Sequence, residues 1–187
     1  MLHFFSSSTR SVSTSRGVQE CLESAMGSEY SKSSLLIFHA SIGHDFKELV
    51  QEASRLSPGA KILAASCCGV IGREGVSESM KDIALMAIKG NDFHVSHCDG
   101  IYGNNSFEKS LHMAKEIKSS KEGVNMIYFL ASGIDIDNDE CIRAIQEVFG
   151  KGVTIFGATS ADNMRGVINF QAVDNEVFEH GAYMVGF

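Results

Sequence analysis

Four short, mostly apolar segments, each leading into a helical pattern or a turn, constrain the fold of this chain most. They cover residues 34–40, 61–66, 125–132 and 153–158. A strand that is apolar on both faces is typical of a sheet covered on both sides. Apolar residues recur at helical spacing over 14–28, 45–56, 107–118 and 139–149, where we expect helices. This alternation predicts an α/β domain.

The C-terminal residues follow a different pattern. Residues 168–173, 176–179 and 181–186 alternate around Asp174 and Asn175, as in a hairpin. Further strands are expected over 2–8, 82–89 and 93–98. We therefore predict a mixed β-sheet with helices packed on its faces, ending in an antiparallel hairpin or meander. No internal repeat of usable period is visible.

Length and composition narrow the class of protein. The chain has 187 residues, one proline and no linker-like tract, so a single domain over residues 1–187 is expected. The net charge of −7 without a basic stripe argues against nucleic acid. No apolar run is long enough to span a membrane, and the N-terminus lacks a secretory pattern. Five cysteines without disulfide spacing indicate reduced thiols and a cytoplasmic protein.

A glycine-rich segment follows the second apolar run. Ligands of open α/β sheets bind beyond the carboxyl ends of strands, and this segment leaves such an end. Small polar groups and glycines would let a ligand approach the backbone, although a plain strand–turn–strand connection explains the glycines too. The spacing matches no phosphate-binding motif. The candidate ligand contacts are Ser66, Cys67, Cys68, Gly69, Gly72 and Arg73.

A second group of small residues follows the run at 153–158. Its candidate contacts are Gly157, Thr159, Ser160 and Asp162. Two strand ends of similar chemistry can face one pocket, where Arg73 or Arg165 could pair with a ligand carboxylate. The alternative is a capped loop. The serine lies at the wrong distance from the glycine for a nucleophile elbow.

Other chemistries have weaker signals. Cys67 and Cys68 could act as nucleophiles, but a buried structural pair is the simpler interpretation. His94, His97 and Cys98 do not share one face of a strand, so no metal site and no cofactor is expected. Haem needs only one axial histidine. The histidines that could supply it are not ranked by spacing and are His39, His44, His94, His97, His112 and His180.

The order of these segments resembles a known family. The turn over residues 66–72 resembles the Gly-Cys-Ser-Thr-Ala-Gly-Glu-type turn of the FIST N domain (F-box and intracellular signal transduction proteins). Residues 156–163 resemble that family's Gly-Gly-x-Ala-x-Asp-like turn, and the final hairpin over 177–187 is also similar. Cys68, Val70 and Arg73 depart from the commoner turn residues, which weakens any transfer of ligand contacts.

The resemblance implies a function. It implies a sensory domain, not an enzyme, that binds a small polar metabolite such as an amino acid. Some family members bind haem and sense nitric oxide, which gives the first alternative; a cysteine-dependent enzyme or a partner-interaction domain is the other. Members usually continue into a FIST C domain, so the expected partners are that domain or a downstream signalling protein, and residues 1–187 would be a fragment or a stand-alone version.

Overall fold

The computed structural model describes residues 1–72 and 75–187. The first half of the chain contains β1 (His3–Thr9), α1 (Thr14–Met26), η1 (Gly27–Lys32), β2 (Leu35–Ser41), α2 (Phe46–Leu56), β3 (Lys61–Cys67), β4 (Val70–Gly72), β5 (Gly75–Ser77) and β6 (Ile83–Lys89). The second half contains β7 (His94–Cys98), α3 (Ser106–Ser120), β8 (Met126–Ala131), α4 (Asn138–Phe149), β9 (Thr154–Thr159), β10 (Gln171–Val173), β11 (Glu176–Phe178) and β12 (Ala182–Gly186).

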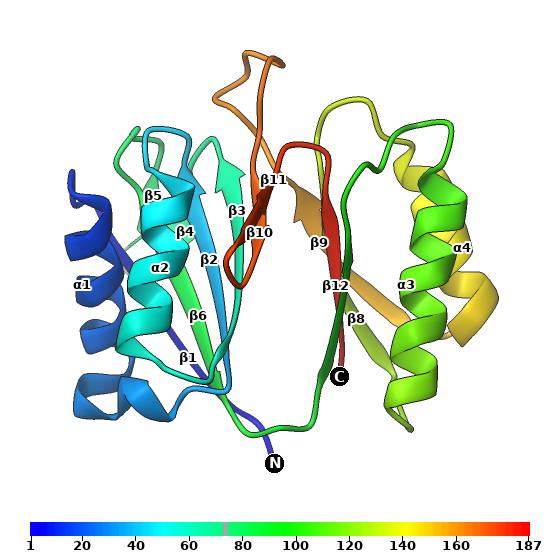
Figure 1. The fold of residues 1–187 in the computed structure, drawn as a ribbon, viewed down its shortest axis with the longest axis horizontal. Coiled ribbons are helices and arrows are strands. Elements are labelled where there is room, and N and C mark those ends of the chain that lie inside the picture. Colours follow the sequence, from blue (N-terminus) through cyan, green and yellow to red (C-terminus); the bar gives the residue numbers. More distant parts are fainter. Residues whose placement is uncertain (73–74) are drawn as a thin grey trace.

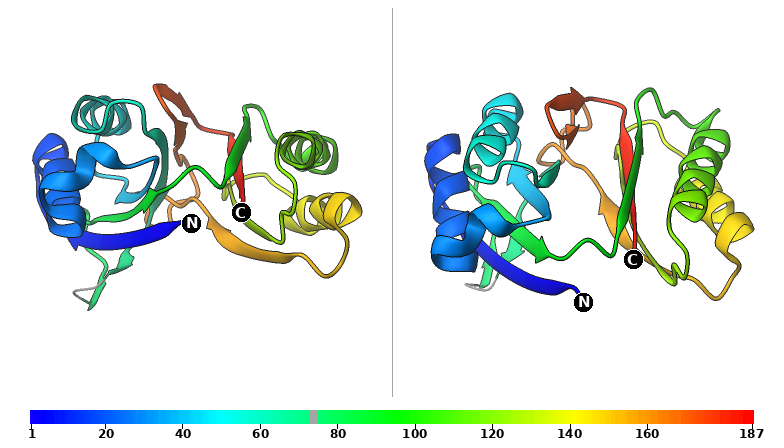
Figure 2. Two further views of the ribbon diagram at one scale, coloured as in Figure 1. Left: turned by 90° about the horizontal axis from the view of Figure 1, so that it is seen from below. Right: turned by 60° about the horizontal axis from the view of Figure 1, so that its bottom comes forward.

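The strands form two large sheets that pack face to face. One has the order β1-β6-β2-β3-β10-β11 and the other β7-β12-β8-β9, while β4 and β5 form a separate two-stranded sheet. In Figure 1, α1 and α2 cover the outer face of the six-stranded sheet, and α3 and α4 cover that of the four-stranded sheet. Figure 2 shows these four layers from two further directions. The predicted class, a mixed α/β fold with helices on its sheets, is confirmed; the division into two sheets was not foreseen.

Three clusters of apolar side chains lie between these four layers: one between each sheet and its helices, and one between the two sheets. In β2, Leu36 and Phe38 pack under α1 and α2, whereas Leu35 and Ile37 face the other sheet. Burial on both faces explains why residues 35–38 of the strand are all apolar. A fully buried side chain of this size contributes about 1.5–3 kcal/mol. No described helix is both long and apolar enough to cross a bilayer.

The two halves of the chain repeat one topology, although the sequence shows no repeat of usable period. In the first half, β1 and β6 are antiparallel, β6 and β2 are antiparallel, and β2 and β3 are parallel. The strands β7, β12, β8 and β9 pair in the same order and directions.

Local contacts repeat as well. The carboxylate of Asp45 caps α2 and that of Asp137 caps α4. The hydroxyl of Thr14 accepts from the Asp45 N–H at 3.2 Å, and the hydroxyl of Ser106 accepts from the Asp137 N–H at 3.0 Å. Side-chain capping of orphan N–H groups therefore fixes the same helix start twice.

The halves differ at one edge. The predicted hairpin is confirmed as β10 and β11, and β10 extends the first sheet by pairing antiparallel with β3. Within residues 1–72 and 75–187, no strand pairs in this way with β9. The sequence predicts a buried strand here, but five of the six β9 residues are exposed because β9 is an edge strand. Figure 2 shows β9 (orange) at the margin of its sheet.

Candidate functional site

The two predicted turns lie side by side. The N–H of Ala161 donates to the carbonyl of Ser66 at 2.9 Å. Ser66 also pairs with Phe170, donating its N–H to the Phe170 carbonyl at 2.8 Å and accepting the Phe170 N–H on its hydroxyl at 2.9 Å. The structure therefore brings the ends of β3 and β9 together, as the sequence suggested.

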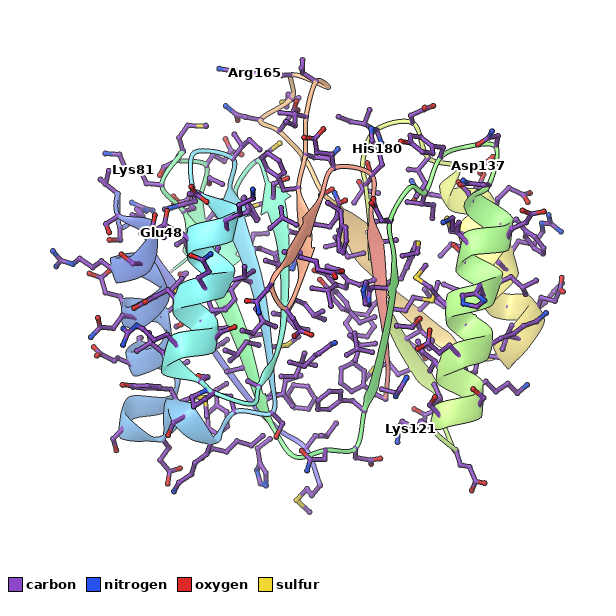
Figure 3. All side chains as sticks on the ribbon, viewed as in Figure 1. Glu48, Lys81, Lys121, Asp137, Arg165 and His180 are labelled. Carbon is purple, nitrogen blue, oxygen red and sulfur yellow. The ribbon has the colours of Figure 1, made fainter. Side chains whose placement is uncertain are left out.

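The carboxylate of Asp162 is occupied by its own loop. It accepts four backbone N–H groups, from residues 165 to 168, at 2.6–3.0 Å. These bonds lower the pKa of Asp162 to about 2, and only 4% of this residue is exposed. The carboxylate thus shapes the loop that projects above both sheets, where Arg165 is labelled in Figure 3.

Some of the other predicted ligand contacts are buried in the fold, and others are accessible to solvent. The hydroxyl of Ser160 is buried against Asn169 and Gln171. Burial raises the pKa of the Cys67 thiol to about 12. Cys68 and Gly72 are half-buried and Thr159 is exposed. Arg73 lies outside the described residues.

Two of the predicted glycines are required by backbone geometry. Gly157 has φ +147°, and a Cβ there would lie 1.7 Å from the Phe129 carbonyl oxygen. A Cβ on Gly69 would lie 2.6 Å from the Ser77 carbonyl oxygen. Glycine alone permits these approaches, so neither residue needs a ligand to explain it.

A hollow that the sequence did not predict lies between the sheets. Its volume is about 380 Å³. Its walls come from β1, β2, β4, β6 and β8, and we call it the inter-sheet cleft. Its lining residues include Ser7, Ile37, His39, Ile71, Met86 and Tyr128. Of the predicted ligand contacts, Gly72 is among its lining residues.

The polar centre of the cleft is a pair of side chains from different sheets. The Nε2 atom of His39 on β2 lies 2.9 Å from the hydroxyl oxygen of Tyr128 on β8. Burial lowers the pKa of His39 and raises that of Tyr128 to about 12. Both groups are therefore neutral near pH 7, and each can donate or accept a hydrogen bond without carrying charge. The ring of Phe156 on β9 lies 5.2 Å from the Tyr128 ring.

Comparison with protein families gives one decisive result. The model of the FIST N domain matches residues 34–187. The chain belongs to the FIST N domain family. This confirms the resemblance seen in the turns, and it makes the chain a sensory domain of signal transduction. A search of curated proteins gives no match.

Both members of the polar pair lie inside the matched part of this FIST N domain. Residues before 34 fall outside the match, yet they supply β1, which pairs with β6, and Ser7, which lines the cleft. Alternation alone could have placed His39 among apolar neighbours on β2. It could not have placed Tyr128 opposite, because no sequence signal aligns residues of two separate sheets.

Proposed function

We propose that this FIST N domain senses a small metabolite, such as an amino acid with an apolar side chain, by binding it in the inter-sheet cleft. The observation that carries the proposal is the His39–Tyr128 pair, which joins both sheets at the wall of a 380 Å³ hollow. Ligand pockets usually measure about 300–1,000 Å³ and combine apolar walls with a few polar groups.

The lining favours a particular ligand chemistry. Ile37, Ile71 and Met86 would contact an apolar body, while the His39–Tyr128 pair would bind one polar group. A ligand that touches both sheets favours one arrangement of them over others. That preference would give a FIST C domain or a downstream signalling protein a change to detect.

The test is a thermal-shift and calorimetric screen of the amino acids. A ligand at 100 times its Kd adds about 2.7 kcal/mol to the free energy of unfolding. Tyr128→Phe removes one hydroxyl and should weaken binding about tenfold. Tyr102 lies just before α3 and its ring is exposed, so Tyr102→Phe should leave the binding affinity unchanged. Unaltered binding by Tyr128→Phe would place the ligand elsewhere, and no shift from any compound would reject the proposal.

Haem is a second candidate ligand, because His39 lines this cleft. A haem iron accepts a neutral imidazole, and burial keeps His39 neutral by lowering its pKa. Its Nε2 atom already contacts Tyr128, so ligation there would require that hydroxyl to move. Titration with hemin tests the idea: a Soret band lost in His39→Ala supports haem, and the absence of a band in the parent chain argues against it.

A binding role also fits Cys67 better than catalysis. A nucleophilic cysteine needs an accessible thiolate, whereas burial raises the pKa of Cys67 to about 12. We expect iodoacetamide to label Cys67 slowly at about pH 7.5 and rapidly in urea. Fast labelling of the folded chain at Cys67, absent in Cys67→Ser, would reopen the enzymatic alternative.

A further inference from the structure

The outer edge of β9 presents free backbone groups. Thr154 and Ser160 donate their N–H groups toward β8, to Asn125 at 3.0 Å and to Ala131 at 2.8 Å. Alternate residues of a strand direct their N–H and C=O groups to opposite sides. Ile155, Gly157 and Thr159 therefore point theirs away from β8, and among the described residues no backbone group pairs with them there.

The first half of the chain shows what this edge can accept. The equivalent strand, β3, uses Ile62, Ala64 and Ser66 to bind β10. The Asp174 N–H donates to the Ile62 carbonyl at 2.7 Å, and the Ser66 N–H donates to the Phe170 carbonyl at 2.8 Å. The repeated topology thus gives β3 a neighbouring strand that β9 lacks.

The sequence of β9 does nothing to block pairing. Edge strands are commonly protected by charged residues or proline. The strand reads Thr-Ile-Phe-Gly-Ala-Thr and contains neither. Phe156 is 39% exposed on it, which leaves an apolar ring at an open edge.

A hollow of about 310 Å³ lies beside β9 on its helix side, lined in part by Phe129, Asn138, Ile142 and Ile155. In the first half, the corresponding space next to α2 is filled. There Phe170 lies 5.4 Å from the Phe46 ring, and Ala172 belongs to the core under α2. The second half therefore lacks both the strand and the side chains that it would bring.

We propose that the free edge of β9 accepts an extended apolar segment of a partner protein as an antiparallel strand, in the way that β3 accepts β10. Alternate side chains of that segment fill the 310 Å³ hollow. The segment is basic before its apolar residues, because Asp137 and Asp139 flank Asn138, which lines this hollow. An antiparallel strand begins beside the C-terminal end of β9, where Thr159 lines the same hollow as Asn138. Figures 1 and 3 show this end of β9 and the start of α4, where Asp137 is labelled, at the same end of the molecule.

The probe is a fluorescein-labelled peptide, Lys-Lys-Asn-Phe-Gln-Ala-Val, in which two lysines precede the sequence of residues 169–173. Its binding to the whole chain is measured by fluorescence anisotropy and by amide shifts of Ile155, Gly157 and Thr159. Thr159→Pro removes one outward N–H, and should raise the Kd about tenfold or more. Thr159→Val keeps the N–H and should bind like the parent chain. Added salt should also weaken binding, through the lysines.

The outcomes separate the proposal from its rivals. No saturable binding at about 1 mM peptide overturns it, as does equal binding by Thr159→Pro and Thr159→Val. If Thr159→Pro fails to fold, a peptide N-methylated at its alanine tests strand pairing on the parent chain, since the equivalent Ala172 lies opposite Ala64 in the β3–β10 ladder. Weaker binding of this peptide supports the proposal, and unchanged binding overturns it. A dimer that Thr159→Pro converts to monomer would assign the edge to a second copy and overturn the proposal. None of these readouts requires the small ligand.

Discussion

His39 and Tyr128 belong to different sheets, and the 2.9 Å contact between the imidazole Nε2 and the phenol oxygen connects them. Burial lowers the pKa of His39, so the folded state binds its proton less readily than the unfolded state, whose histidine pKa is about 6.5. His39 therefore stabilises the fold fully above that pH, and the contribution falls as pH drops through the folded-state pKa.

Urea unfolding at about pH 7.5 and about pH 5 checks this dependence. We expect the parent chain to lose stability at the lower pH and His39→Leu to lose less. His3→Gln, at an exposed position, should behave like the parent. An equal loss in His39→Leu and the parent would show that other groups cause the dependence.

Gly157→Ala should destabilise the chain by roughly 3 kcal/mol, because the new methyl group would collide with the Phe129 carbonyl at a backbone φ of +147°. Gly152 provides a matched control, since a Cβ there meets nothing within 4 Å. Chemical denaturation of both variants measures the difference. A cost below about 1 kcal/mol for Gly157→Ala would mean that β9 can move away from β8.

The repeated helix starts predict equal effects at two distant sites. Asp45→Ala and Asp137→Ala each remove a cap and should each cost about 1 kcal/mol. The double variant should lose the sum of the two costs, because the residues share no partner. Strong non-additivity in denaturant unfolding would indicate that the two halves are coupled through these helices.

Local patterns in the sequence predicted most elements correctly. The helix expected over 139–149 is α4, and the strand expected over 82–89 is β6. Apolar runs report burial on two faces, but they do not say whether a helix or a second sheet covers each face. Leu35 and Ile37 meet the other sheet, and Leu36 and Phe38 meet helices, although all four look alike in the sequence.

The candidate site was harder to predict for a related reason. Hydroxyls and carboxylates after a strand indicate ligand binding and loop capping equally well, and the backbone bonds of Asp162 show capping here. The repeat was invisible because it is carried by hydrogen-bond positions, such as Thr14 and Ser106, more than by residue identity. The pairing of His39 with Tyr128 depends on how two sheets pack, which no local pattern records.

The Asp162 carboxylate holds a loop that contains Met164, 94% exposed, and Arg165. We expect Asp162→Ala to speed tryptic cleavage after Arg165 about tenfold, since the loop then opens more readily. Arg165→Gln should abolish the cut, and Glu122→Gln should change nothing. Unchanged cleavage in Asp162→Ala would show that the loop keeps its shape without the carboxylate.

Asp162 should also make the stability of the fold depend on pH in the acid range. The pKa of Asp162 is lowered to about 2 by the four N–H groups, so its contribution to stability is present above about pH 4 and is lost as pH falls toward 2. The urea midpoints of the parent and Asp162→Asn should therefore converge over that interval. A constant difference between them would contradict the assignment.

The pairing of β3 with β10 also matters during synthesis. Ser66 and its partner Phe170 are 104 positions apart, and the ribosome adds about 5–20 residues per second. The outer edge of β3 consequently emerges seconds before the hairpin that covers it. During that interval the nascent chain exposes an unpaired apolar edge, which is the kind of surface that chaperones bind and that promotes aggregation.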